Sequence, residues 1–372
     1  MDWASADFEC GTGRLSVAEV SEEHVIRAAR DGWQTFRGCR WAVSLRATGI
    51  FGRMESHVIT ALAVTLLSLS ACHEPSASGP APMLRERLAG AWQRVDGPSV
   101  LHFDGDRCVF ADDGRQVLFA VTYGDDGIRR RPLADEVVLE ERVAFSEGGM
   151  TLTYPGGRVV AYRRLAAVPD DARADALELG ARQPAAGEIE RLSAELRERT
   201  ERDQQIRNEL AEVMRSPQGR DPQSTATQAV MQRMRKIDVP NTQWLVGIVR
   251  DVGWIDRVRF PDRACSDAFL LVQHSGNLRL MQAVLPLIEG ELRTRPEVGE
   301  EFALLYDRTQ LELGNPQRYG TQLRGDSAGV MHVRRLEVPD RVDERRRSVG
   351  LGPHADYLEH FRKDGAQVVV DR

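Results

Sequence analysis

Side chains that can do acid–base chemistry are concentrated in the C-terminal half of this 372-residue chain. Gln273 and His274 interrupt one apolar run, and Asp307 and Arg308 close another. The helix dipole disfavours an aspartate near a helix C-terminus, so Asp307 is expected to have a specific partner, His274 or Arg308. A histidine oriented by an aspartate, beside an arginine, can act as a general base next to an anion clamp. His274, Asp307 and Arg308 are therefore the catalytic candidates; for His274, a satisfied core histidine is the alternative.

A second set of polar residues is expected to bind a ligand. Gln317, Tyr319 and Gln322 offer neutral donors and acceptors on a predicted turn and strand. Asp203 and Arg207 are four residues apart, so they can pair along one helix face. Asp203 falls on an apolar stripe, where a carboxylate is costly unless it has a partner. Two interpretations of Asp203 stay open: a structural ion pair and a residue of a binding site.

Composition and motifs restrict the chemistry that these residues can perform. The net charge is −6, which argues against a nucleic-acid partner. Neither HExxH, a phosphate-cradling loop nor GxGxxG occurs. The eight histidines show no paired metal spacing, and no two cysteines have CxxC spacing, so neither a metal site nor a cofactor is expected. We therefore expect a binding or accessory module, with a cofactor-free hydrolase or transferase acting on a small anionic or amide substrate as the alternative.

Helices are expected to position these side chains, in a mainly α-helical domain over residues 186–365. The first helix carries an apolar stripe of period 3.5–3.6, formed by Ile189, Leu192, Leu196, Ile206, Leu210 and Val213. Further helices are predicted over 228–236, 238–252, 266–287, 297–310 and 353–361. Asp238 or Asn241 is the predicted N-cap of the second of these. A short β-hairpin is predicted from 319–323 and 330–336.

Residues 84–165 show the pattern of a small β domain. Short alternating runs are separated by Asp-Gly, Gly-Gly and Pro-Gly turns, which is typical of a meander that forms a barrel or sandwich. Strands are predicted at 100–103, 108–110, 117–121, 137–139, 150–154 and 159–162. Residues 88–92 (LAGAW) resemble the first strand of lipocalin-like domains, and Trp92 is expected to close one end of a barrel. An Ala/Pro/Asp-rich linker, 166–185, follows, so the predicted fold class is α+β with several domains.

From about Arg202 to Tyr357, spaced polar motifs extend through the helical region. They are Asp203-Gln204 with Arg207, Asp238 with Asn241, Gly253-Trp254, Gln273-His274, Gln282, Asp307-Arg308, the segment 314–322 (GxPQxYGTQ), Asp343 to Arg346, and Val349-Gly350-Leu351. This part of the chain resembles a bacterial family known only as a domain of unknown function. The resemblance implies a mainly helical fold in which polar residues gather in one place.

The segment before the β domain predicts a lipid anchor. Residues 58–71 are apolar and uncharged, too short to span a bilayer but long enough for a signal-peptide core. They end in Leu69-Ser70-Ala71-Cys72, which resembles the lipobox of bacterial lipoproteins. The expected organisation is a non-native extension (1–42), a signal peptide (43–71), and lipidated Cys72 with a flexible tether (72–83). The mature protein is thus expected in the cell envelope, facing the periplasm or the exterior. Its expected partners are the membrane, through the lipid on Cys72, and an unknown small molecule or envelope protein.

Overall fold

The computed structural model describes residues 81–216, 224–326, 330–363 and 367–370. It also gives the backbone of β1 (Phe8–Cys10), β2 (Gly13–Leu15), β3 (Gln34–Phe36) and β4 (Cys39–Trp41), which pair as β1 with β2 and β3 with β4. The predicted signal peptide and Cys72 lie outside the described residues. Within the described part, no helix is both long and apolar enough to cross a membrane.

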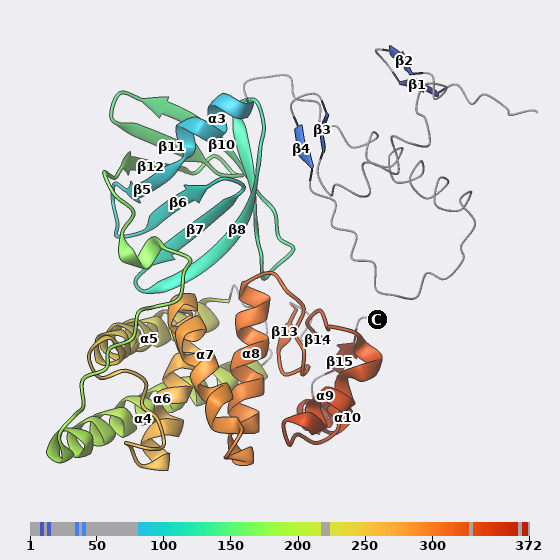
Figure 1. Ribbon diagram of the computed structural model, residues 1–372. Helices are drawn as coiled ribbons and strands as arrows, with labels where there is room; N and C mark the ends of the chain where they lie inside the picture. The colour runs from blue at the N-terminus through green and yellow to red at the C-terminus, as the bar shows by residue number, and fades with distance from the viewer. Residues whose placement is uncertain are drawn as a thin grey trace, which may run out of the picture. The chain divides into compact units, whose positions relative to one another are not determined.

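Eight antiparallel strands form a closed barrel in the order β10-β11-β12-β5-β6-β7-β8-β9, which confirms the predicted β domain (Figure 1). Each strand pairs with its sequence neighbours, and β12 pairs with β5 to close the ring. The short helix α3 (Ala81–Leu88) precedes β5. The strands are β5 (Gly90–Arg94), β6 (Val100–Asp104), β7 (Arg107–Asp112), β8 (Arg115–Tyr123), β9 (Gly127–Pro132), β10 (Leu139–Ser146), β11 (Gly149–Thr153) and β12 (Val159–Arg164).

One strand was predicted wrongly and one was missed. Val137 and Val138 are exposed in the loop before β10, which begins at Leu139 and continues to Ser146. The preceding strand β9 carries three consecutive arginines, so it lacks an apolar alternation. Its inward position at Arg130 is satisfied by Glu141 of β10, with which it forms a buried ion pair. A charged pair thus takes the place of the apolar pattern that marks the other strands.

The barrel core includes Trp92, which is 3% exposed. Its indole Nε1 donates to the carbonyl of Leu88, the last residue of α3, at 2.7 Å. Leu84 and Leu88 of α3 belong to the same apolar cluster as Trp92, Leu101, Phe103 and other inward-facing residues. Helix α3 and Trp92 therefore pack together on the barrel interior.

The rest of the described chain is mainly helical, as predicted, with a small sheet beside α8 (Figure 1). Its helices are α4 (Ala186–Arg215), α5 (Thr225–Val252), α6 (Asp262–Ser275), α7 (Leu278–Leu292), α8 (Gly299–Glu312), α9 (Val342–Ser348) and α10 (His354–Lys363), with 3-10 turns η2 (Asp170–Ala172), η3 (Pro296–Val298) and η4 (Pro339–Arg341). Strands β13 (Leu323–Gly325) and β14 (Val330–Val333) form the predicted hairpin, but β13 begins only at the last residue of the predicted strand 319–323, and β14 ends three residues before its predicted end. Strand β15 (Gln367–Val370) adds a parallel strand that was not predicted.

Two predicted helix boundaries are wrong. Helix α5 runs without interruption through Pro240, so neither Asp238 nor Asn241 caps a helix; both are interior positions. Proline removes one backbone donor, and the packing of α5 against α4 and α6 outweighs that loss. Conversely, the predicted helix 266–287 is two helices. Gly276 adopts a left-handed conformation at φ 61°, and the side chain of Asn277 caps α7 by accepting from the N–H of Leu280.

The α6–α7 turn is also where the helices contact the barrel. The N–H of Gln116 donates to the carbonyl of Gly276 at 2.9 Å, and Asn277 Nδ2 donates to the carbonyl of Gly114 at 2.7 Å. Val109 and Leu118, on the outside of the barrel, pack against Leu278 at the start of α7. The turn between β7 and β8 thus packs on residues directly after His274.

Candidate functional site

Three titratable side chains from three helices gather around the buried carboxylate of Asp203, and we call the four residues the Asp203 cluster. Asp203 of α4 is 1% exposed, and its Oδ2 lies 2.8 Å from Nδ1 of His274 on α6. Arg207, one turn along α4, lies 3.3 Å from Asp203 and 3.1 Å from Asp238 of α5. Burial raises the pKa of Asp238, against the opposing effect of Arg207. The predicted pairing of Asp203 with Arg207 is confirmed, and His274 joins it.

The Asp203 cluster has the geometry to orient a base. Asp203 fixes the ring of His274 through Nδ1, and the His274 side chain is 21% exposed. Among the described residues, no hydrogen bond to Nε2 is found, so that nitrogen is available to a proton or a ligand. Within the same part of the chain, His274 has no hydrogen bond to a serine, threonine or cysteine.

A second centre surrounds Arg308 of α8, which is half-buried. Its Nη1 donates to the carbonyl of Gln273 at 2.5 Å, and Nε and Nη2 donate to Oε1 of Gln322 at 3.2 and 3.1 Å. Burial lowers the pKa of this guanidinium. No carboxylate of the described residues lies within 4.0 Å of it. The Gln273 side chain, 5% exposed, has both amide atoms unpartnered among the described residues. Arg308 is thus a half-buried cation whose side-chain hydrogen bonds go only to neutral acceptors.

Asp307 does not pair with His274 or Arg308, so that prediction is wrong. Its carboxylate accepts from the backbone N–H groups of Arg318, Tyr319 and Thr321 at 2.7 to 2.9 Å, and from the Thr321 hydroxyl at 2.9 Å. Its pKa is nevertheless raised, because burial outweighs these hydrogen bonds. The carboxylate at the end of α8 is satisfied by the turn that follows the helix, so its role is to hold that turn.

Gln317 and Tyr319 also support the turn and do not line either centre directly. Gln317 is fully buried; its Nε2 donates to the carbonyls of Gln322 and Arg334, and its Oε1 accepts from the N–H of Gln322. Tyr319 packs edge-on against Phe302 and Tyr306. Of the predicted binding residues, Asp203 and Arg207 therefore join His274, and Gln322 joins Arg308. Gln317 positions Gln322, and Tyr319 packs in the core beside the turn.

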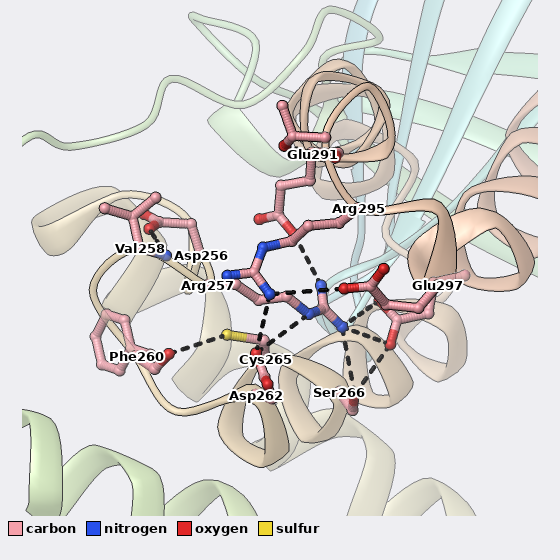
Figure 2. Close-up of polar contacts among 12 residues, drawn as sticks. Asp256, Arg257, Val258, Phe260, Asp262, Cys265, Ser266, Glu291, Arg295 and Glu297 are labelled. Carbon is pink, nitrogen blue, oxygen red and sulfur yellow. Dashed lines mark hydrogen bonds and ion pairs between the residues drawn. The ribbon is translucent and has the colours of Figure 1, made fainter.

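A third buried polar cluster has a structural explanation (Figure 2). Arg257, in the loop between α5 and α6, is 7% exposed and donates to Glu291 of α7 and Glu301 of α8, each at 2.8 Å. Ser266 of α6 donates to Glu301 at 3.0 Å. The guanidinium satisfies groups from three helices and points inward. We call this the Arg257 cluster and attribute to it the packing of the loop on α7 and α8.

The barrel offers a separate cavity of about 680 Å³. Its lining residues are Thr122, Tyr123, Gly124, Asp126, Gly127, Ile128, Arg129, Glu140, Glu141, Arg142, Thr153, Tyr154, Pro155 and Gly157. Glu141 is the carboxylate that pairs with Arg130, so both its oxygens already have donors. The described residues contain no group of three or more metal-ligating His, Cys, Asp or Glu side chains. Cys108 and Cys265 are both buried free thiols.

Sequence comparison separates the two halves of the described chain. Residues 190–368 match a family of unknown function (DUF6624), as the resemblance implied. The matched range contains the Asp203 cluster and Arg308 and excludes the barrel. Neither the curated proteins nor the solved structures gave a match to the chain.

Proposed function

We propose that this protein is an envelope lipoprotein, tethered through Cys72, whose helical domain binds a small anionic ligand at Arg308. The observation that carries the binding proposal is the environment of this guanidinium: half-buried, donating to Gln273 and Gln322, and without a carboxylate within 4.0 Å among the described residues. A buried charge is stable only when it is paired or fully hydrogen-bonded. An anion is the group that would complete this environment.

The surroundings of Arg308 favour a small ligand over a structural counter-ion. Gln322 is held in place by Gln317 and by its own donation to Thr321, so the acceptor that orients Arg308 is itself fixed. The unpartnered amide of Gln273 lies on α6 beside His274, and its backbone carbonyl contacts Arg308. Prepositioned donors with few competing acceptors are typical of binding sites.

The proposal is tested by isothermal titration calorimetry of the full chain with acetate, sulfate and inorganic phosphate at constant ionic strength. We expect at least one of these anions to bind, and Arg308→Gln to weaken it by roughly 10- to 100-fold, because a charge-assisted hydrogen bond contributes about 1.5–3 kcal/mol. Arg197→Gln is the matched control, because Arg197 is exposed on α4. Equal affinity in the wild type and Arg308→Gln, or no binding of any anion, would refute the proposal.

General-base catalysis is a second candidate, favoured by the 2.8 Å contact between Asp203 and His274 Nδ1. The sequence predicted Asp307 as the partner that orients His274 in a cofactor-free hydrolase. Asp203 takes that place in the hypothesis. General-base catalysis would be supported by turnover of 4-nitrophenyl phosphate or 4-nitrophenyl acetate. The His274→Asn variant should abolish this turnover while circular dichroism shows an intact fold. Absence of turnover above the buffer rate, or turnover that survives His274→Asn, would leave binding as the function.

A further inference from the structure

The barrel brings an arginine to the helical site. Arg115 is the first residue of β8, and it lies against the α6–α7 turn: a Cβ built on Gly276 would stand 2.9 Å from Arg115 Nε. The N–H of Gln116, the next residue, donates to the Gly276 carbonyl and fixes this contact. Arg115 has neither a hydrogen bond nor an ion pair from its side chain among the described residues. Its guanidinium therefore lies against Gly276, which is two residues after His274 in the sequence, and has no counter-ion within 4.0 Å among the described residues.

A third arginine approaches from the small sheet. The N–H of Arg334, directly after β14, donates to the carbonyl of Gln322 at 3.1 Å, and its own carbonyl accepts from Gln317. Gln322 is the residue that orients Arg308. Within the described ranges, the Arg334 side chain has no ion-pair partner. Asp135, a carboxylate near Arg334, is paired with Arg324.

One half-buried carboxylate, Glu312, interacts electrostatically with all three of these arginines. Glu312, one turn after Arg308 on α8, is half-buried, and burial raises its pKa. The charges that oppose this effect come from Arg334, Arg308 and Arg115. No ion pair of Glu312 within 4.0 Å is found among the described residues. Three arginines thus act on one half-buried carboxylate, and the formal charge of these four groups is 3 − 1 = +2.

We propose that Arg115, Arg308 and Arg334 together bind a dianionic phosphate group, so that the site is completed by the barrel. This inference rests on the proposed anion site at Arg308. A phosphate monoester or free phosphate carries a charge close to −2 at neutral pH and several acceptor oxygens, which matches the local charge and three guanidinium donors. A monocarboxylate would leave one positive charge unpaired.

The test is isothermal titration calorimetry of the full chain at pH 7.5 and constant ionic strength with inorganic phosphate, glycerol 3-phosphate and acetate. We expect both phosphates to bind at least about 10-fold more tightly than acetate. Arg115→Gln and Arg334→Gln should each weaken phosphate about 10-fold. Arg107→Gln, an exposed arginine at the start of β7, should leave the affinity unchanged. Tighter binding of one phosphate over the other identifies whether an ester or free phosphate is the ligand.

Three outcomes separate this inference from the proposed function. If Arg308→Gln weakens phosphate and the Arg115 and Arg334 variants do not, the anion site stands and the three-arginine site is wrong. Acetate bound as tightly as phosphate also overturns the inference. If no anion binds, both proposals fail. Where Arg115→Gln does not fold, Glu312→Gln gives the decisive result: it raises the local charge to +3 and should tighten phosphate several-fold, and unchanged affinity contradicts the site.

Discussion

Glu312 shows how a single residue links stability to pH in this protein. Burial raises its pKa above the ordinary value of 4.5, while Arg334, Arg308 and Arg115 act in the opposite direction and do not compensate fully. Between 4.5 and the raised pKa, the folded chain binds a proton that the unfolded chain has lost. The contribution of protonated Glu312 to the free energy of unfolding is therefore complete below pH 4.5, and it is lost as the pH rises through the folded-state pKa.

Glu312→Gln should remove this dependence, because glutamine has no proton to lose. The free energy of unfolding of the variant, relative to wild type, should rise as the pH increases from 4.5 and then level off. The total rise should be about 1.4 kcal/mol for each unit by which the folded-state pKa of Glu312 exceeds its ordinary value. Urea denaturation at a series of pH values measures the difference. Parallel curves for the two proteins, or a variant whose relative stability falls with pH, would show that Glu312 is not the responsible carboxylate.

Asp203 is the residue whose role depends most on its neighbours. Its position on the apolar stripe of α4 left two interpretations open, an ion pair or a site residue, and the structure gives it both Arg207 and His274 as partners. The partner on the same helix could be predicted from the four-residue spacing. The histidine partner could not be predicted, because His274 is 71 residues from Asp203 in the sequence and reaches it only when α6 packs on α4.

At the scale of elements, the Arg257 cluster adds a buried ionic connection between a loop and two helices, beside the apolar anchors Trp254, Ile255 and Phe260 of the same loop. Arg257→Met removes the one cation between Glu291 and Glu301, so two largely buried carboxylates face each other. The expected loss in free energy of unfolding is about 3–5 kcal/mol, measured by urea denaturation. Arg295→Met is the control within the same view (Figure 2): its ion pairs are solvent-exposed, and the expected loss is below about 1 kcal/mol. Equal losses for both variants would contradict this assignment.

Helices and strands could be predicted where apolar residues recur at the helical or strand period, and could not be predicted where they do not. The long stripe of α4 and the alternation of β6, β7 and β8 gave the correct elements. Strand β9 was missed because its inward residue, Arg130, is satisfied by an ion pair with Glu141 on the adjacent strand β10. A break was predicted between residues 236 and 238, yet α5 continues through Pro240, because the packing of α5 on α4 and α6 outweighs one lost hydrogen bond.

The residues of the candidate site could be predicted only in part, because their partners depend on tertiary contacts. Arg308 and Gln322 were named as separate features of a helix and a turn, and they meet as expected of a common site. Asp307 was assigned the wrong partner, because the backbone of the turn at 318–321 satisfies it without any side-chain signal. Arg115 had no signal in sequence, since its place in the site depends on how the barrel packs on the α6–α7 turn.

For the whole molecule, the contact between barrel and helices makes Gln116 a structural link. Its side chain is 4% exposed; Nε2 donates to the carbonyls of Asp171 and Arg173, and Oε1 accepts from the N–H of Arg279. The predicted linker thus contributes to the interface through η2 and does not act only as a spacer. An anion bound between Arg115 and Arg308 would add a further contact across the same interface.

The proposed lipid anchor places this two-part body at a membrane surface. Modification of Cys72 with a diacylglyceryl group supplies two acyl chains, and two chains are what stable membrane anchoring requires. In a bacterial host, the wild-type protein should enter the detergent phase of a Triton X-114 partition, and Cys72→Ser should move it to the aqueous phase. Cys39→Ser, in the segment expected to be absent from the mature protein, should partition like the wild type. Mass spectrometry of the mature N-terminus checks the same proposal. An intact, unlipidated segment upstream of Cys72 would overturn it, and the proposed anion site would then belong to a protein that is not tethered through Cys72.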